Sequence, residues 1–74
     1  MMLEYIEVTY PTTRSVYVDG LLTGVTNKPL RVEAGTHRFD LGTPVDYKPV
    51  SQNIVVTETT PLCPMEISFT KNGV

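Results

Sequence analysis

The chain has no tryptophan, one cysteine and one histidine, and no apolar stretch approaches the roughly 18 residues of a membrane helix. With Cys63 as the only cysteine, an internal disulfide framework of the kind found in many small secreted domains is excluded. We therefore expect a reducing compartment or a domain that folds without disulfides. Cys63 is predicted to be buried as a small hydrophobe, and a bridge to another chain is the minority alternative.

The chain also has no large excess of positive or negative charge. Six basic and eight acidic side chains give a net charge of −2, and they are scattered along the chain. Without a run of lysine or arginine, no continuous positive face forms, so nucleic acid is not expected as a partner. The start, MMLEYIEVTY, has no basic and no long apolar region, so we expect no signal peptide and no membrane insertion. A full-length chain would then be cytoplasmic or virion-associated, and an excised domain would belong to a cell envelope.

The length of 74 residues predicts a single domain over residues 1–74, with residues 71–74 frayed. A chain of this size buries only about 60% of the surface that its unfolded form exposes. It has little room for a core and a deep cleft together, because small-molecule pockets need about 300 Å³ or more. Small size therefore disfavours catalysis without excluding it.

Apolar residues alternate with polar ones at a period of two, which indicates strands, and no window shows helical spacing. Gly and Pro clusters separate the alternating runs every 8 to 12 residues or closer, as in a small all-β sandwich or barrel. We predict an antiparallel β-sandwich of about seven short strands. They span residues 3–10, 15–19, 21–25, 29–33, 36–42, 50–57 and 63–70.

The segment VYVDGLLTG (Val16–Gly24) predicts a hairpin, because Asp-Gly between apolar runs favours a two-residue turn. Alternation also predicts the core. Its members are Leu3, Ile6, Val8, Tyr10, Val16, Val18, Leu22, Leu30, Val32, Phe39, Leu41, Ile54, Val56, Met65, Ile67 and Phe69.

No constellation of residues indicates catalysis, a metal site or a cofactor. His37 has no partner at a recognisable ligand spacing, so we interpret it as a structural residue at the rim of the sandwich. Asp19 lacks the further acidic groups of a calcium loop, so we interpret it as a turn residue. Glu4 with Glu7 is interpreted as ordinary outer-face carboxylates, as are Asp40 and Asp46. The glycines lack the lysine of a phosphate loop, and we expect no enzyme.

The four tyrosines are the most suggestive feature of the sequence. Tyr17 lies between two inward valines and should point outward, as should Tyr5 if Ile6 is inward. Exposed tyrosines are enriched at recognition surfaces. We therefore select Tyr5, Tyr17, Tyr47 and Val55 as candidate partner-binding residues. The alternative, that the tyrosines only pair across strands with other outward side chains, stays open.

The run from Arg14 to Val56 resembles a PEGA domain. The pattern of that family is V-x-V-D-G, a short return strand with a glycine, threonine-proline, an apolar strand, Gly-x-His, Gly-Tyr with a following proline, and a closing V-x-V strand. The matching positions are Val16, Val18, Asp19, Gly20, Gly24, Thr26, Pro29, Leu30, Val32, Gly35, His37, Phe39, Tyr47, Pro49, Ile54 and Val56. Asn27 and Lys28 are additional, and the spacing in GTPVDY is longer than in the family pattern.

This resemblance implies a transthyretin-like sandwich without catalytic residues, used as a module in bacterial and archaeal envelope proteins; a phage-encoded accessory protein is a further possibility. The leading hypothesis is a non-catalytic interaction or structural module that acts through sheet edges and exposed side chains. The second is an oligomeric assembly or decoration protein of a virion or cell envelope. The third is a carbohydrate-binding module with an exposed tyrosine platform. The expected partner is a protein or a second copy, and a carbohydrate is the alternative.

Overall fold

The computed structural model describes residues 2–72, which form nine strands and no helix. The strands are β1 (Leu3–Thr9), β2 (Ser15–Val18), β3 (Leu21–Val25), β4 (Pro29–Glu33), β5 (Gly35–Asp40), β6 (Tyr47–Lys48), β7 (Gln52–Val56), β8 (Met65–Ser68) and β9 (Thr70–Lys71). Within residues 2–72, no helix is long and apolar enough to cross a membrane.

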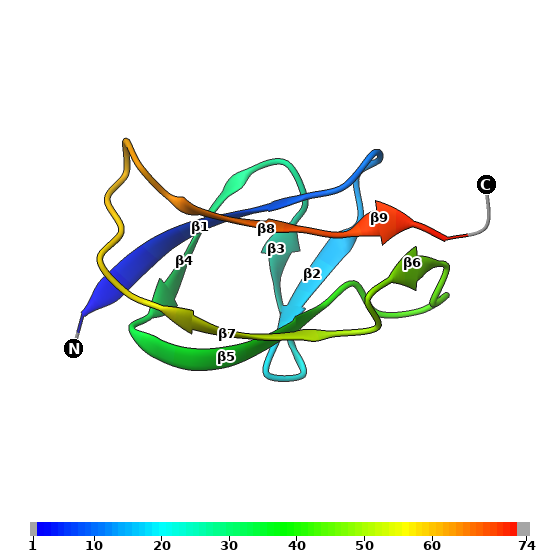
Figure 1. Cartoon of the computed structure of the whole chain (residues 1–74), viewed down its shortest axis with the longest axis horizontal. Coiled ribbons are helices and arrows are strands. Elements are labelled where there is room, and N and C mark those ends of the chain that lie inside the picture. The colour runs from blue at the N-terminus through cyan, green and yellow to red at the C-terminus, as the bar shows by residue number, and fades with distance from the viewer. Residues whose placement is uncertain (1, 73–74) are drawn as a thin grey trace.

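Two sheets face each other across the core (Figure 1). One contains three strands in the order β4-β1-β8, and the other contains four in the order β3-β2-β5-β7. The short strands β6 and β9 pair at one end of the molecule. The predicted all-β sandwich is therefore confirmed.

One pairing departs from the antiparallel pattern. β1 and β8 run parallel, with Ile6 beside Met65 and Val8 beside Ile67. Parallel neighbours cannot be joined by a tight turn and need a crossover connection, and here the chain between β1 and β8 forms all the strands from β2 to β7. Alternation within a strand does not reveal its direction relative to a distant strand, so the sequence could not distinguish this case.

The C-terminal segment differs in detail from the predicted strand 63–70. β8 begins only at Met65, and a break at Phe69 separates it from β9. Lys71 pairs with Tyr47, and the backbone N–H of Asn72 donates to Asp46 O at 2.8 Å. Residues 71 and 72 are thus hydrogen-bonded and not frayed, whereas 73 and 74 lie outside the described residues.

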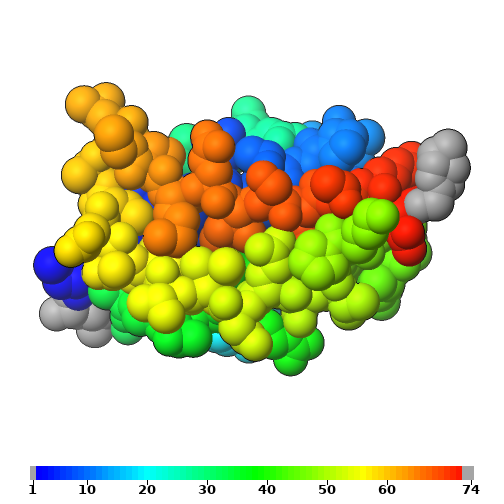
Figure 2. All heavy atoms as spheres, viewed as in Figure 1, coloured from blue at the N-terminus to red at the C-terminus, as the bar shows by residue number. Residues whose placement is uncertain are grey.

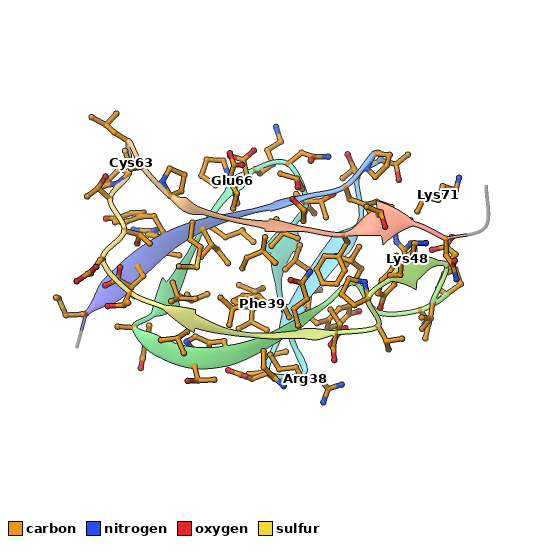
Figure 3. The ribbon with its side chains drawn as sticks, in the orientation of Figure 1. Arg38, Phe39, Lys48, Cys63, Glu66 and Lys71 are labelled. Atoms are coloured by element: carbon orange, nitrogen blue, oxygen red, sulfur yellow. The ribbon has the colours of Figure 1, made fainter. Side chains whose placement is uncertain are left out.

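The core lies between the two sheets. Figure 3 shows Phe39 pointing into it, while its neighbour Arg38 points away from the molecule. The buried apolar residues are Ile6, Val8, Tyr10, Val16, Val18, Val32, Phe39, Leu41, Tyr47, Val56, Ile67 and Phe69. Leu30, Ile54 and Met65 pack against them from the rim. Most of the predicted core is therefore confirmed.

Three residues were predicted to be buried and are not. Leu22 is 64% exposed because the hairpin register places it opposite Tyr17, on the outer face. Leu3 is half exposed because it lies opposite Glu33, also on an outer face. Cys63 is exposed because it belongs to the loop before β8 and not to the strand.

The Asp19-Gly20 turn is confirmed. Val18 pairs with Leu21 across it, and the two turn residues have φ values of 54° and 84°. Positive φ at both central positions defines a type I′ turn, whose twist matches that of the flanking strands. The side chain of Asp19 also accepts the backbone N–H of Arg38 at 2.9 Å, which fastens the turn to β5.

The additional residue Asn27 extends the ladder beside β1. Its backbone N–H donates to Val8 O at 2.7 Å, and its side chain accepts the N–H of Tyr10 and donates to Tyr10 O. The side-chain amide of Asn27 thereby makes the two hydrogen bonds to Tyr10 that the backbone of a neighbouring strand would otherwise make. Asn27 has a φ of 64°, a value that asparagine tolerates better than most residues.

Candidate interaction surfaces

The four candidate residues do not form one surface. Tyr17 and Val55 lie on the outer face of the four-stranded sheet, at its β2 and β7 positions. Tyr5 lies on the outer face of the other sheet, between Arg31 on β4 and the start of β8. The outward placement predicted for Tyr5 and Tyr17 is confirmed, because Ile6, Val16 and Val18 are all buried.

Tyr47 is not at the surface, and its selection as an exposed contact residue is wrong. It is 2% exposed and packs edge-to-face against Tyr10 and Phe69. Its hydroxyl donates to Gly42 O at 2.8 Å and accepts the backbone N–H of Leu41. Tyr47 thus closes one end of the core and cannot serve as a carbohydrate platform.

Tyr17 is partly covered by its own chain. Its ring lies against Gly42, where a Cβ atom would come within 2.5 Å of the ring carbon Cε1. Across the sheet it pairs with Leu22 on β3 and Asp40 on β5. This arrangement fits the alternative in which an outward tyrosine pairs with neighbouring strands.

Tyr5 forms the floor of a hollow of about 400 Å³, which we call the Tyr5 groove. Its lining residues are Tyr5, Glu7, Pro29, Leu30, Arg31, Pro61 and Pro64. Arg31 lies directly opposite Tyr5 in the β1–β4 register, and Pro29 lies opposite Glu7. One aromatic ring, one guanidinium and one carboxylate thus share a mostly apolar, open groove, which is the composition of many small-ligand sites.

The loop wall of the Tyr5 groove is held by Glu4 and Thr59. Thr59 Oγ1 accepts the backbone N–H of Tyr5 at 2.6 Å and donates to Glu4 Oε1 at 2.6 Å, and the N–H of Thr59 donates to the same carboxylate at 2.8 Å. These hydrogen bonds lower the pKa of Glu4. Glu4 is only 4% exposed, so its interpretation as an outer-face carboxylate is wrong.

The sheet edges form a second kind of surface, because an unpaired edge strand offers backbone hydrogen bonds to another chain. Among residues 2–72, the outer strands of the two main sheets are β3, β4, β7 and β8, and the two-residue strands β6 and β9 pair only with each other. Natural edges are usually protected by proline, charge, bulges or covering groups. The four edges differ in how many of these features they have.

Three of the edges are protected. β4 begins with Pro29 and contains Arg31 and Glu33. β3 contains a register shift opposite Val16/Tyr17, which marks a bulge. β8 follows Pro64 and contains Glu66, and its carbonyl at Ser68 accepts the side-chain amide of Gln52 at 2.7 Å.

β7 is the unprotected edge. Its sequence, QNIVV, has no charge, proline or glycine, and its five residues pair with β5 in an unbroken register. Figures 1 and 2 show β7 at the front of the view, with no other segment in front of it. Val55, opposite Thr36, is 59% exposed.

The direction of the backbone groups of β7 follows from the bonds of β5. Arg38 O accepts from Asp19 N, and Arg38 N donates to Asp19 Oδ1, so both backbone groups of Arg38 face β2. Successive residues of an antiparallel ladder face opposite sides. His37 and Phe39 therefore face β7, where they meet Ile54 and Gln52.

It follows that Asn53 and Val55 direct their N–H and C=O groups away from β5. These four groups lie two residues apart on one side of an extended strand, the arrangement that an added strand requires. On β7, these outward backbone groups coincide with an exposed apolar side chain on a strand without a bulge, whereas on β3 the exposed Leu22 lies next to a register shift.

The family model of the PEGA domain matches residues 6–70, nearly the whole chain. The chain belongs to the PEGA domain family. No curated protein and no solved structure gives a match.

In this PEGA domain, several positions of the family pattern have a local physical role. Gly24 lies beneath Leu30, whose Cδ2 atom occupies the place that a Cβ would need. Asp19 accepts from Arg38 N and bonds the ring of His37. His37 also packs edge-to-face on Phe39, with ring centroids 6.2 Å apart. These residues fasten the β2–β3 hairpin to β5.

A further cluster in the PEGA domain was not found from the sequence. The Arg14 guanidinium donates to Asp46 Oδ1 at 2.6 Å and to the carbonyls of Leu41 and Pro44, and it lies over the rings of Tyr10 and Tyr47. This ion pair lowers the pKa of Asp46. Arg14 is separated from Asp46 by 32 residues, so no spacing pattern could reveal the pair.

In the part of the chain that the structure describes, no three His, Cys, Asp or Glu side chains lie close enough to hold a metal ion.

Proposed function

We propose that this PEGA domain is a non-catalytic interaction module that binds an extended segment of another polypeptide by strand addition to β7. The observation that carries the proposal is the β7 edge itself: an unbroken, uncharged strand whose Asn53 and Val55 present four free backbone groups. Main-chain hydrogen bonds would give affinity, and contacts with alternate side chains would give specificity.

The side chains around β7 support this mode of binding. Val55 and Asn53 lie on the outer face, beside Thr36 and Arg38 of β5, and Ile54 lies on the inner face at the rim of the core. An added strand would therefore cover an exposed valine on one side and a half-buried isoleucine on the other. Burial of such apolar surface stabilises a complex by about 25 cal/mol per Å² before the costs of association.

The test uses proline as a backbone probe. Val55→Pro removes an N–H that points away from β5, so it leaves the β5–β7 ladder intact and blocks an added strand. The matched control is Leu22→Pro on the β3 edge. The side chain of Leu22 is 64% exposed. Its backbone N–H points away from β2, because the backbone groups of its partner Tyr17 point to β5.

Nine-residue peptides selected from a random display library on the wild-type domain are then titrated and followed by amide chemical shifts. We expect the largest shifts at Asn53 and Val55, at least tenfold weaker binding to Val55→Pro, and unchanged binding to Leu22→Pro. Folding of both variants is checked by the dispersion of their amide spectra. Selected peptides that bind Val55→Pro as tightly as the wild type would contradict the proposal.

A second candidate function is carbohydrate binding in the Tyr5 groove. The specific observation in its favour is the cross-strand pair of Tyr5 and Arg31 with Glu7 nearby, which offers a ring face for stacking and two charged groups for hydroxyls or a carboxylate. Titration with neutral and acidic oligosaccharides tests it. Binding should be lost in Tyr5→Ala and kept in Val55→Pro; binding that Tyr5→Ala retains would exclude this site.

A further inference from the structure

We propose that the occupant of the β7 edge is a second copy of this chain, paired antiparallel about a twofold axis at Ile54. This inference rests on the proposed strand addition at β7 and names its partner. A twofold interface uses the same patch on both copies, so the patch has to be complementary to itself. β7 meets this requirement in its backbone and in its side chains.

The backbone requirement concerns which residues face each other. Asn53 and Val55 are the residues whose N–H and C=O groups point to the open edge. A twofold axis at Ile54 places Asn53 opposite Val55 of the second copy, and Val55 opposite Asn53 of the second copy. Both pairs are then hydrogen-bonded pairs of an antiparallel ladder, and all four outward groups of each chain find a partner.

The side chains are compatible with the same register. On the outer face, the side chains that lie side by side across the four joined strands are Thr36 and Val55 of one copy, then Asn53 and Arg38 of the second copy. Each such row of side chains contains one charged residue, at its end. On the inner face, Ile54 meets Ile54 of the second copy. Like charges directly opposite each other destabilise a sheet, and this register contains none.

The other layer of the sandwich does not oppose the pairing through charge. β8 lies beside β7 in Figure 2, and the side-chain amide of Gln52 on β7 donates to Ser68 O on β8. Glu66 of β8 points to the outer face of its own sheet in Figure 3, away from the β7 side. Two copies joined at β7 would therefore keep their Glu66 carboxylates apart.

The protection of the remaining edges explains why association would end at two copies. An exposed, uncharged edge is a site of uncontrolled pairing, and proteins usually protect or cover it. β3, β4 and β8 have bulges, proline or charge, whereas β7 has none of these. A closed twofold dimer covers the one unprotected edge of the two main sheets in residues 2–72 and leaves their protected edges outside.

The first test is the mass in solution by light scattering on a sizing column, from about 5 µM to 1 mM. We expect a concentration-dependent dimer, with a dissociation constant raised at least tenfold by Val55→Pro and unchanged by Leu22→Pro. The measurement is made with reductant and repeated with Cys63→Ser, because Cys63 is exposed and could join two chains by a disulfide.

The second test fixes the register by cross-linking in the Cys63→Ser background. Ile54 would face itself as a non-hydrogen-bonded pair, whose Cα separation of about 4.5 Å permits a disulfide. Asn53 would face Val55 and not itself. We therefore expect rapid oxidation of Ile54→Cys to a covalent dimer and much slower oxidation of Asn53→Cys.

The outcomes separate this inference from the proposed function. A monomer at all concentrations overturns the dimer, and strand addition at β7 survives if selected peptides still lose affinity for Val55→Pro. A dimer that persists in Val55→Pro, or one that Cys63→Ser abolishes, overturns the inference by assigning the contact to another surface. Equal cross-linking of Ile54→Cys and Asn53→Cys overturns the twofold register.

Discussion

The ring of His37 is bonded on both sides: Nδ1 lies 2.6 Å from Asp19 Oδ2, and Nε2 lies 2.6 Å from the carbonyl oxygen of Glu33. A carboxylate and a carbonyl only accept, so both ring nitrogens donate and the ring is positively charged in this geometry. The charged ring ties the turn after β2 to the end of β4. The hydrogen bond with Asp19 raises the pKa of His37 and lowers the pKa of Asp19.

This pair predicts a window of stability in pH. The contribution of His37 is complete below its unfolded pKa of about 6.5 and is lost as pH rises through the raised folded pKa. The contribution of Asp19 is present above about 3.8 and is lost as pH falls through the lowered folded pKa. We expect the pair to stabilise most between about pH 4 and 6.5, by about 1 kcal/mol or less because Asp19 is half exposed.

Thermal unfolding of wild type and His37→Gln from pH 3.5 to 9 measures this effect. The difference in melting temperature should be largest in the window and shrink above it, since a neutral His37 cannot donate to both acceptors. A difference that stays constant across the range would show that His37 acts through packing on Phe39 alone.

The hydroxyl of Thr59 predicts a second effect on stability. Thr59→Val keeps the shape but removes the group that accepts from Tyr5 N and donates to Glu4. With net contributions of about 0.5–1.5 kcal/mol for each of the two hydrogen bonds, we expect a melting temperature lower by roughly 5–15 °C. Thr59→Ser, which keeps the hydroxyl, should lie close to the wild type. The stabilisation by Glu4 should fade as pH falls through its lowered folded pKa, from about 4.5 downward.

Alanine substitutions at Gly42 and Gly20 should reduce stability by different amounts. Both have positive φ, 72° and 84°, but a Cβ at Gly42 would meet the Tyr17 ring, whereas nothing lies within 4 Å of a Cβ at Gly20. Gly20→Ala should cost about 1 kcal/mol for the backbone strain alone, and Gly42→Ala about 3 kcal/mol because overpacking adds to the strain. Chemical denaturation measures both. Adding Tyr17→Ala should recover part of the loss at Gly42; no recovery would disprove the steric explanation.

The contacts of Arg14 predict that lysine at this position would lower the stability of the domain. Its planar head bonds Asp46 and two carbonyls while it lies over two rings, and an ammonium cannot reproduce this geometry. We expect Arg14→Lys to reduce the free energy of unfolding by about 1–2 kcal/mol. Arg31→Lys on the exposed β4 edge, as control, should stay within about 0.5 kcal/mol. Equal effects of the two substitutions would contradict the role of the Arg14 head group.

Local chemistry explains why the strands and the hairpin were predictable. Alternation places Ile6, Val8, Val16 and Val18 on buried faces, because successive side chains of a strand point to opposite sides. Asp19-Gly20 defines its turn because both residues adopt positive φ at low cost. The same alternation could have placed Glu4 on the inner face with Ile6 and Val8, although its carboxylate identity suggested an exposed position.

The sequence by itself determined the all-β class, most of the buried residues and the outward direction of Tyr5, Tyr17 and Val55, because these depend on neighbours along one strand. Only the tertiary structure decided that Tyr47 is buried, that β8 runs parallel to β1 and that Arg14 meets Asp46. It also decided which strands are edges, and therefore that β7 is open while β2 and β5 are covered. Pairing between distant segments sets each of these features, and alternation within one strand carries no information about which strand becomes its neighbour.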